Sequence, residues 1–152
     1  MMLKINLKMK QKMKELKGNH LVLTDELQSI ISSGFIEKEH CFFSKKLMNY
    51  SSSASKKHFQ DCVGFECFVN SLHIDDYVDK NHLEYSILFC NSLLISWEYL
   101  NPNDKLNVII SLDEFGALIK FHLDRNGEMW LSEDLESYDE PILITNSFIK
   151  LQ

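Results

Sequence analysis

Residues 108–132 read VIISLDEFGALIKFHLDRNGEMWLS, a stretch in which strand-forming runs alternate with turn signals. Val108–Leu112 is rich in β-branched residues, and a turn with Gly separates it from a second run, Ala117–Leu123. Asn126-Gly127 is the favoured two-residue hairpin turn, after which Glu128–Ser132 returns as a third strand. The stretch predicts an antiparallel β-meander in the C-terminal third of the chain.

The hairpin turn also fixes which side chains share a face. A two-residue turn pairs Arg125 with Glu128, two opposite charges that add a few tenths to ~1 kcal/mol to the pairing. The core face is then expected to carry Ile119, Phe121, Leu123 and Trp130, and the solvent face Lys120, His122 and Asp124. Residues 141–145 are expected to form a fourth strand, with Pro141 at the first position, where a strand tolerates proline.

Upstream of the meander, helical periodicity is clear. Apolar residues recur at steps of four and three, which predicts a central helix from about His82 to Leu100, capped by Asn81 with Glu84. The recurring residues are Leu83, Ile87, Cys90, Leu94 and Trp97. A shorter helix is expected over Asp25–Ser33, with Thr24 as its N-cap and Gly34 as its stop.

Two regions allow more than one structure. Residues 1–19 fit a basic amphipathic helix ended by Gly18-Asn19, but the first ten also alternate like a strand. We favour a terminal helix packed by its methionine stripe onto the acidic body. Residues 59–72 likewise fit both periods, whereas 50–57, rich in serine, are expected to be a flexible surface loop. The whole chain, 1–152, is interpreted as one α+β domain with the meander packed against the central helix and helices at the N-terminus.

Charge changes along the chain. Residues 1–19 carry a net charge of +5, whereas 59–152 carry −12 and form an acidic body. A negative field repels phosphate backbones and attracts basic surfaces, so we expect no direct nucleic-acid binding and a basic protein as partner. The residues expected to bind this partner are Asp75, Asp76, Asp79, Asp113, Glu114, Glu133, Asp134, Glu136, Tyr138, Asp139 and Glu140.

Motifs for other functions are weak. No CxxC or HxxxH spacing and no glycine-rich phosphate loop occurs, which predicts no metal and no cofactor. The four cysteines, Cys41, Cys62, Cys67 and Cys90, are expected to be free buried thiols in a reducing cytoplasm. No signal peptide or apolar run long enough to cross a bilayer is visible, so no membrane insertion is expected.

The segment Phe121–Ile144, FHLDRNGEMWLSEDLESYDEPILI, in a small acidic α+β domain resembles the immunity proteins of bacterial polymorphic-toxin and contact-dependent growth inhibition systems. The resemblance implies a non-enzymatic protein that binds and neutralises a cognate toxin domain, often a nuclease with a basic cleft. It assigns no role to single residues.

Two alternatives remain. A small enzyme would use His122 with Asp124 as its acid/base pair, although no nucleophile accompanies them in the sequence. An adaptor subunit would be recruited through its basic N-terminus.

Overall fold

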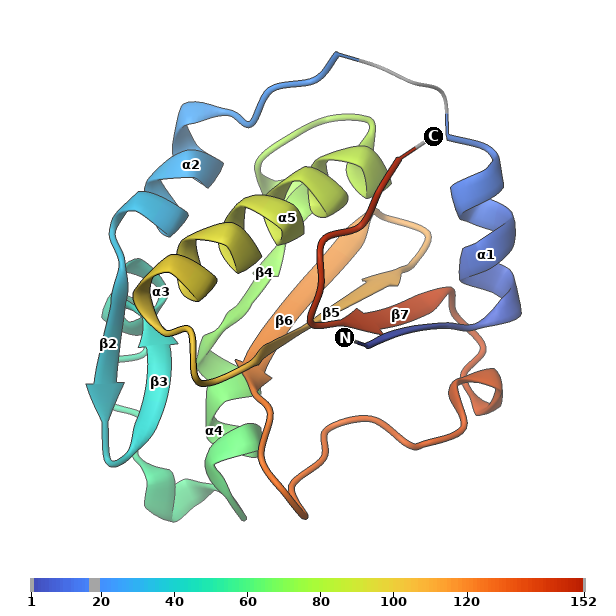
Figure 1. The fold of residues 1–152 in the computed structure, drawn as a ribbon. Helices are drawn as coiled ribbons and strands as arrows, with labels where there is room; N and C mark the ends of the chain where they lie inside the picture. Colours follow the sequence, from blue (N-terminus) through green and yellow to red (C-terminus); the bar gives the residue numbers. More distant parts are fainter. Residues whose placement is uncertain (1, 17–19, 152) are drawn as a thin grey trace.

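The computed structural model describes residues 2–16 and 20–151. Within them, five antiparallel strands form one sheet in the order β1-β7-β5-β6-β4 (Figure 1). These strands are β1 (Leu3–Ile5), β4 (Ser71–His73), β5 (Leu106–Leu112), β6 (Ala117–Leu123) and β7 (Ile142–Thr145). The helices are α1 (Leu7–Lys14), α2 (Asp25–Ser32), α3 (Lys45–Asn49), α4 (Cys62–Val69) and α5 (His82–Leu100). The α+β fold with an antiparallel sheet is confirmed.

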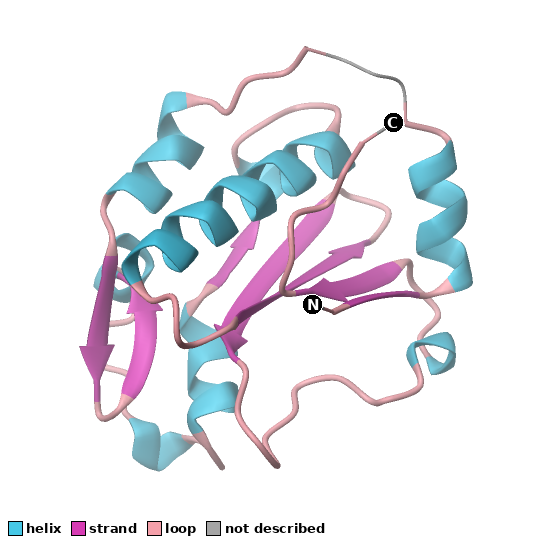
Figure 2. Cartoon of the chain, in the orientation of Figure 1, coloured by secondary structure: helices cyan, strands magenta, loops and turns pink. Residues whose placement is uncertain are grey.

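Helix α5 crosses one face of the sheet and forms the main core with it (Figure 2). Its bounds, His82–Leu100, are the predicted ones. Ile119 and Phe121 of β6 are fully buried beneath it, as the register predicted, and each such side chain contributes about 1.5–3 kcal/mol. The expected cap is wrong: Asn81 adopts a left-handed backbone with φ of 59° and makes no side-chain cap.

The third strand of the meander does not form. Arg125 and Glu128 make an isolated bridge, as expected, but the chain then leaves the sheet. We call residues 124–141, which join β6 to β7, the strap. Leu131 and Leu135 of the strap pack against the second face of the sheet, beside Ile109 and Ile142. This packing replaces strand pairing for 128–132, and Trp130, expected in the core, is 45% exposed.

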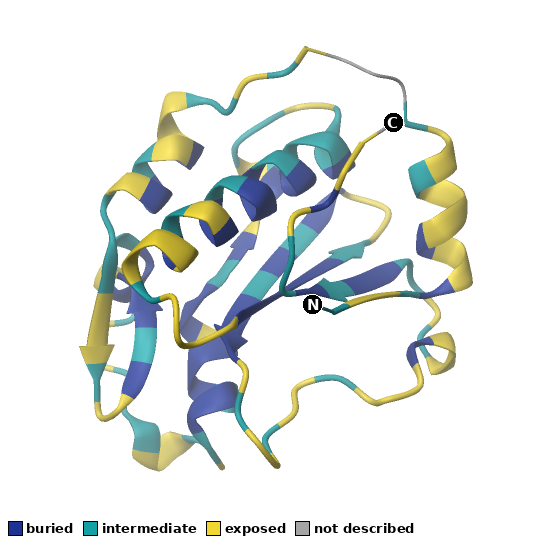
Figure 3. Cartoon of the chain, viewed as in Figure 1, coloured by how far each residue is buried: buried dark blue, intermediate teal, exposed yellow. Residues whose placement is uncertain are grey.

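Because the strap covers the second face, the prediction for that face is also wrong. His122 was expected to point to solvent but is only 3% exposed, and Lys120 is half-buried. Asp124, at the start of the strap, is exposed. Figure 3 shows β5 and β6 in the colours of buried and intermediate residues along their whole lengths. Periodicity identifies the two faces but does not tell whether a loop covers one of them.

The N-terminus uses both of its sequence patterns in turn. β1 pairs with β7, and α1 then begins after Asn6, whose side chain caps the backbone N–H of Met9. Met9 is fully buried, and Glu136 of the strap accepts hydrogen bonds from the backbone N–H of Leu7. The packing of this helix onto the acidic body is therefore confirmed. The predicted stop at Gly18-Asn19 lies outside the described residues.

Residues 35–69 form a second small layer beside the sheet. The hairpin of β2 (Phe35–Lys38) and β3 (Cys41–Ser44) packs with α3 and α4 around Phe43 and Phe65. The ambiguous segment 59–72 resolves into α4 followed by β4, so both periods are used in succession. As predicted, Thr24 caps α2 and Gly34 follows it with a positive φ of 83°, which glycine adopts without strain.

The expectation of four free thiols is wrong. Cys41 and Cys62 form a disulfide that joins β3 to the first residue of α4, whereas Cys67 and Cys90 are free and buried. Sequence spacing gave no signal for this pair because the fold, not a motif, brings β3 and α4 together. With one disulfide present, the cysteines no longer indicate a reducing cytoplasm.

The serine-rich segment 50–57 is a surface loop, as expected, that ends in the one-turn helix η1 (Lys56–His58). It is held by the turn of the β2–β3 hairpin. Lys38 Nζ donates to the carbonyl of Ala54, and Glu39 accepts from the backbone N–H of Lys56. None of the helices in the described part of the chain is long and apolar enough to cross a membrane.

Candidate functional site

A cavity of about 240 Å³ lies between the strap and the second face of the sheet. We call it the strap cavity. Asn107 of β5 and His122 of β6 lie directly opposite each other in the sheet register, and both line it. Each is at least nine-tenths buried. The cavity is thus built on two adjacent strands that the rigid core holds in place.

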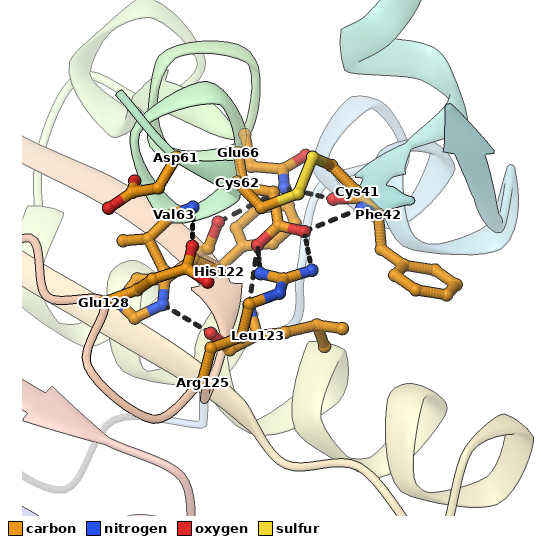
Figure 4. A network of polar contacts seen from close by, with 12 residues as sticks. Cys41, Phe42, Asp61, Cys62, Val63, Glu66, His122, Leu123, Arg125 and Glu128 are labelled. Carbon is orange, nitrogen blue, oxygen red and sulfur yellow. Dashed lines mark hydrogen bonds and ion pairs between the residues drawn. A yellow bond between two sulfur atoms is a disulfide. The ribbon is translucent and has the colours of Figure 1, made fainter. Parts of the chain in front are cut away.

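His122 presents a hydrogen-bond acceptor that has no partner. Its Nδ1 lies 2.8 Å from the carbonyl oxygen of Leu123 (Figure 4). A carbonyl oxygen only accepts, so Nδ1 carries the proton and Nε2 of the neutral ring is an acceptor. Burial lowers the pKa of His122, an effect that the hydrogen bond to Leu123 and then the charge of Glu66 partly oppose. Nε2 is buried and lacks a hydrogen-bond partner among the described residues.

Asn107 presents a second such acceptor. Three other buried asparagines, Asn6, Asn70 and Asn91, use both ends of their amides on backbone groups. Asn107 Oδ1, in contrast, is buried with no hydrogen-bond partner in residues 2–16 and 20–151. A buried polar atom without a partner costs about 1–3 kcal/mol, which makes such atoms rare in folded proteins. Both residues line the strap cavity, which makes the cavity the candidate site.

A buried ion pair between Glu66 and Arg125 lies beside the cavity, and Arg125 is part of the cavity lining. Glu66 of α4 is completely buried and binds the guanidinium of Arg125 through both of its oxygens, at 2.6 and 2.7 Å (Figure 4). The same carboxylate accepts from the backbone N–H groups of Phe42 and Leu123, at 2.7 and 2.9 Å. It therefore ties β3, α4 and β6 together. The expected ion pair of Arg125 with Glu128 is corrected: Glu128 instead accepts from the backbone N–H of Val63.

The open side of the cavity is acidic and partly apolar. Asp124, Glu128 and Glu133 line it, against the cations Lys4 and Arg125. Because Arg125 is already neutralised by Glu66, carboxylates dominate. Met129 and Trp130 form an exposed apolar rim, at 58% and 45% exposure.

Lys120 fixes one side of this rim. Its ammonium donates to the carbonyl of Cys67 and to Ser71 Oγ, both at 3.2 Å, and lies 5.3 Å from the ring centre of Trp130. Desolvation lowers the pKa of Lys120. The cation holds the indole against the second face of the sheet, so that Trp130 is positioned while remaining accessible.

Some of the sequence-predicted partner residues do converge, but at another place. Asp113 and Glu114 of the β5–β6 turn and Asp139 and Glu140 of the strap surround an open hollow of about 560 Å³ next to exposed Phe115. We call this the turn-end hollow. Asp75, in η2 (Ile74–Asp76), lies against the same turn, since a Cβ at Gly116 would come within 2.5 Å of its carboxylate. Asp76 and Asp79, which follow Asp75 closely in the sequence, are exposed.

Other predicted partner residues serve the fold. Glu136 accepts from the N-terminus of α1, and Asp134 from the backbone N–H of Glu136 in η3 (Leu135–Ser137). The Tyr138 hydroxyl accepts from the backbone N–H of Ser132. Of the predicted set, only Glu133 lines the strap cavity.

Asn107 and Glu66 were missed by the sequence reasoning. Each is one polar residue inside an apolar run, LNVII for Asn107 and VGFECFV for Glu66. A polar residue in such a run is the available signal, because burying it requires a partner. The sequence does not tell which of the two is satisfied inside the fold.

Comparison with known proteins identifies a family. A model described as the Uncharacterized protein PM0498 family matches residues 4–150. The Uncharacterized protein PM0498 of Pasteurella multocida (strain Pm70) is 33% identical over 117 residues, covering 70% of this chain and 73% of that protein. No solved structure matches significantly. With nearly its whole length matched, the chain belongs to the Uncharacterized protein PM0498 family.

Proposed function

We propose that this protein is an immunity-type binding protein that captures a basic protein partner, a toxin domain, through the strap face. The strap face consists of the strap cavity and its rim, Met129 and Trp130. One observation carries the proposal: the strap cavity is bordered by three carboxylates, those of Asp124, Glu128 and Glu133, beside the exposed side chains of Met129 and Trp130.

The composition of the strap face supports a protein partner. Exposed tryptophan and methionine beside a pocket are typical of residues that dominate binding energy at interfaces. The surrounding carboxylates favour encounter with a basic surface and repel an acidic one. The segment that resembles immunity proteins, Phe121–Ile144, contains the whole strap.

The test is capture of a host protein by the tagged full chain at low and high salt. The protein with Glu128→Lys and Glu133→Lys is compared with a matched control, Asp113→Lys with Glu114→Lys at the turn-end hollow. The two variants change charge equally, but only the first changes the strap face. We expect the first variant to lose the partner and the control to retain it. Loss in both would indicate general charge attraction and contradict the proposal.

Neutralisation needs its own measurement. The captured protein, produced alone in the host, is expected to arrest growth, and co-production of this protein to restore it. The Glu128→Lys, Glu133→Lys variant should fail to restore growth. A captured protein that is harmless would refute the immunity role while leaving the binding role in place.

A small enzyme is the second candidate, and the unpartnered Nε2 of His122 favours it. A neutral imidazole whose Nδ1 is fixed by a carbonyl is an arrangement suited to a general base. This candidate requires that His122→Gln abolish a turnover activity while the fold remains intact. An adaptor recruited through the N-terminus has less support, since Met9 of α1 is buried against the body.

A further inference from the structure

We propose that a groove beside α1 binds one molecule of a long-chain carboxylate, such as a free fatty acid. The groove lies between α1 and the C-terminal segment, residues 146–151 (Figure 1), and has a volume of about 480 Å³. We call it the α1 groove. It shares no lining residue with the strap cavity, so this site goes beyond the proposed function and does not depend on it.

Both walls of the α1 groove are held in place by buried asparagines. Asn6 caps α1 by accepting from the backbone N–H of Met9, which is itself fully buried. On the C-terminal segment, Asn91 of α5 exchanges two hydrogen bonds with the backbone of Ile149, at 2.7 and 2.8 Å. The groove residue Lys150 follows directly. The groove is therefore formed by two segments that the core positions.

The floor of the α1 groove is apolar. Ile5, Met13 and Leu16 are half-buried and pack against the main core, and Leu151 of the C-terminal segment is 44% exposed. None of the described side chains that line the groove carries an oxygen or nitrogen acceptor, because the polar ones are all lysines. A peptide backbone buried there would find no side-chain acceptor for its N–H groups, which costs free energy, whereas an alkyl chain has no such groups. The floor thus favours an alkyl chain.

The rim of the α1 groove is positive. Lys10, Lys14 and Lys150 line it, and no carboxylate does so among the residues that the structure describes. The lysines on the other side of the helix differ, since Lys8 donates to a strap carbonyl and Lys12 lines the acidic turn-end hollow. Three ammonium groups beside an apolar floor complement a ligand with one anionic end and one alkyl end.

The shape of the site favours a single molecule over a bilayer. A helix that lies on a membrane presents an apolar face outward. Met9 of α1 instead points into the core, and apart from Leu7 every exposed residue of the helix is polar. The apolar surface next to α1 is therefore the floor of a groove, where one alkyl chain fits.

The experiment is isothermal titration calorimetry of the full chain with hexanoate, octanoate and decanoate, each below its micelle-forming concentration. We expect saturable binding of decanoate, with an affinity that rises about two- to fourfold for each added methylene group that enters the groove. Decyltrimethylammonium, which has the same chain length and the opposite charge, is the matched control ligand and is expected not to bind.

Two pairs of substitutions on one helix locate the site. Lys10→Gln with Lys14→Gln is expected to weaken decanoate binding at least about threefold. Lys8→Gln with Lys12→Gln removes the same charge from the other side of α1 and is expected to leave binding unchanged. Leu151→Ser, at an exposed position, is expected to weaken decanoate binding more than hexanoate binding. Circular dichroism checks that each variant is folded.

The absence of saturable decanoate binding, or equal binding of decyltrimethylammonium, overturns the inference. Equal losses in the two lysine pairs also overturn it, because they would indicate general charge attraction. Binding that appears only with vesicles of anionic phospholipid would indicate a membrane-binding surface and overturns it as well.

Discussion

Replacing Asn107 by leucine is expected to stabilise the free protein. Asn107 is 5% exposed, and its Oδ1 lacks a partner in the part of the chain that the structure describes. A buried unpartnered acceptor costs about 1–3 kcal/mol, and leucine removes that cost while its extra volume enters a cavity of about 240 Å³. We expect the free energy of unfolding to rise by about 2 kcal/mol, or roughly 4–8 °C in Tm for a chain of this size.

The assay is urea unfolding followed by circular dichroism, with Asn70→Leu as the matched control. Asn70 is equally buried, but its amide binds the N–H of Ser44 and the carbonyls of Phe42 and Phe121. Its replacement leaves those groups unpaired and is expected to cost at least about 3 kcal/mol. A wild-type or lower stability of Asn107→Leu would mean that its amide already has a partner inside the folded protein, and would refute the reasoning.

Three further predictions concern the surroundings of the site. Glu66→Gln leaves Arg125 without its counter-charge and is expected to lower the free energy of unfolding by about 3 kcal/mol, measured in urea; a loss below about 1 kcal/mol would contradict the buried ion pair. Reducing the disulfide between Cys41 and Cys62, which are 21 residues apart, is expected to lower the free energy of unfolding by about 3 kcal/mol. Burial raises the thiol pKa of Cys67 and of Cys90 to about 12, so both thiols should resist alkylation until the chain unfolds. Burial lowers the pKa of His122 in the folded protein, so as pH falls the unfolded chain is protonated at this residue first. The free energy of unfolding should therefore fall as pH drops below about 6.5 and level off below the pKa of the folded state. If His122→Gln showed the same dependence of stability on pH as the wild-type protein, this contribution would be refuted.

Elements with strong local signals were predictable from the sequence. The periodicity of α5 and the turn residues around β6 gave both elements with their observed bounds, and Thr24 and Gly34 marked the ends of α2 correctly. These signals are local because helix caps, turns and side-chain periodicity depend on residues a few positions apart.

The strap was not predictable for a physical reason. Asn126-Gly127 does form its turn, but pairing of 128–132 with β6 competes with burial of Leu131 and Leu135 on the second face. That competition is decided by tertiary packing, which single-sequence patterns do not contain. The same packing buries His122, so the candidate site changed from an exposed acid/base pair to a cavity.

Some residues of the site can be identified from the sequence alone, and others cannot. The sequence identified His122 as an acid/base candidate and Glu133 as part of an acidic binding surface, because histidine beside a carboxylate and runs of acidic residues are recognisable patterns. Asn107 and Glu66 are both polar residues in apolar runs, but the fold gives them different partners: Glu66 accepts four hydrogen bonds, whereas Asn107 Oδ1 accepts none from the described residues. That difference is visible only in three dimensions.

The central claim is that the strap face binds the partner. The most direct measurement is the affinity of the captured partner for the wild-type protein and for Trp130→Ala, by isothermal titration calorimetry. Trp130 is 45% exposed at the rim of the strap cavity, and a tryptophan that anchors an interface contributes about 2 kcal/mol or more, so we predict binding at least about tenfold weaker for the variant. Unchanged affinity would contradict the claim, because the exposed indole would then contact no partner.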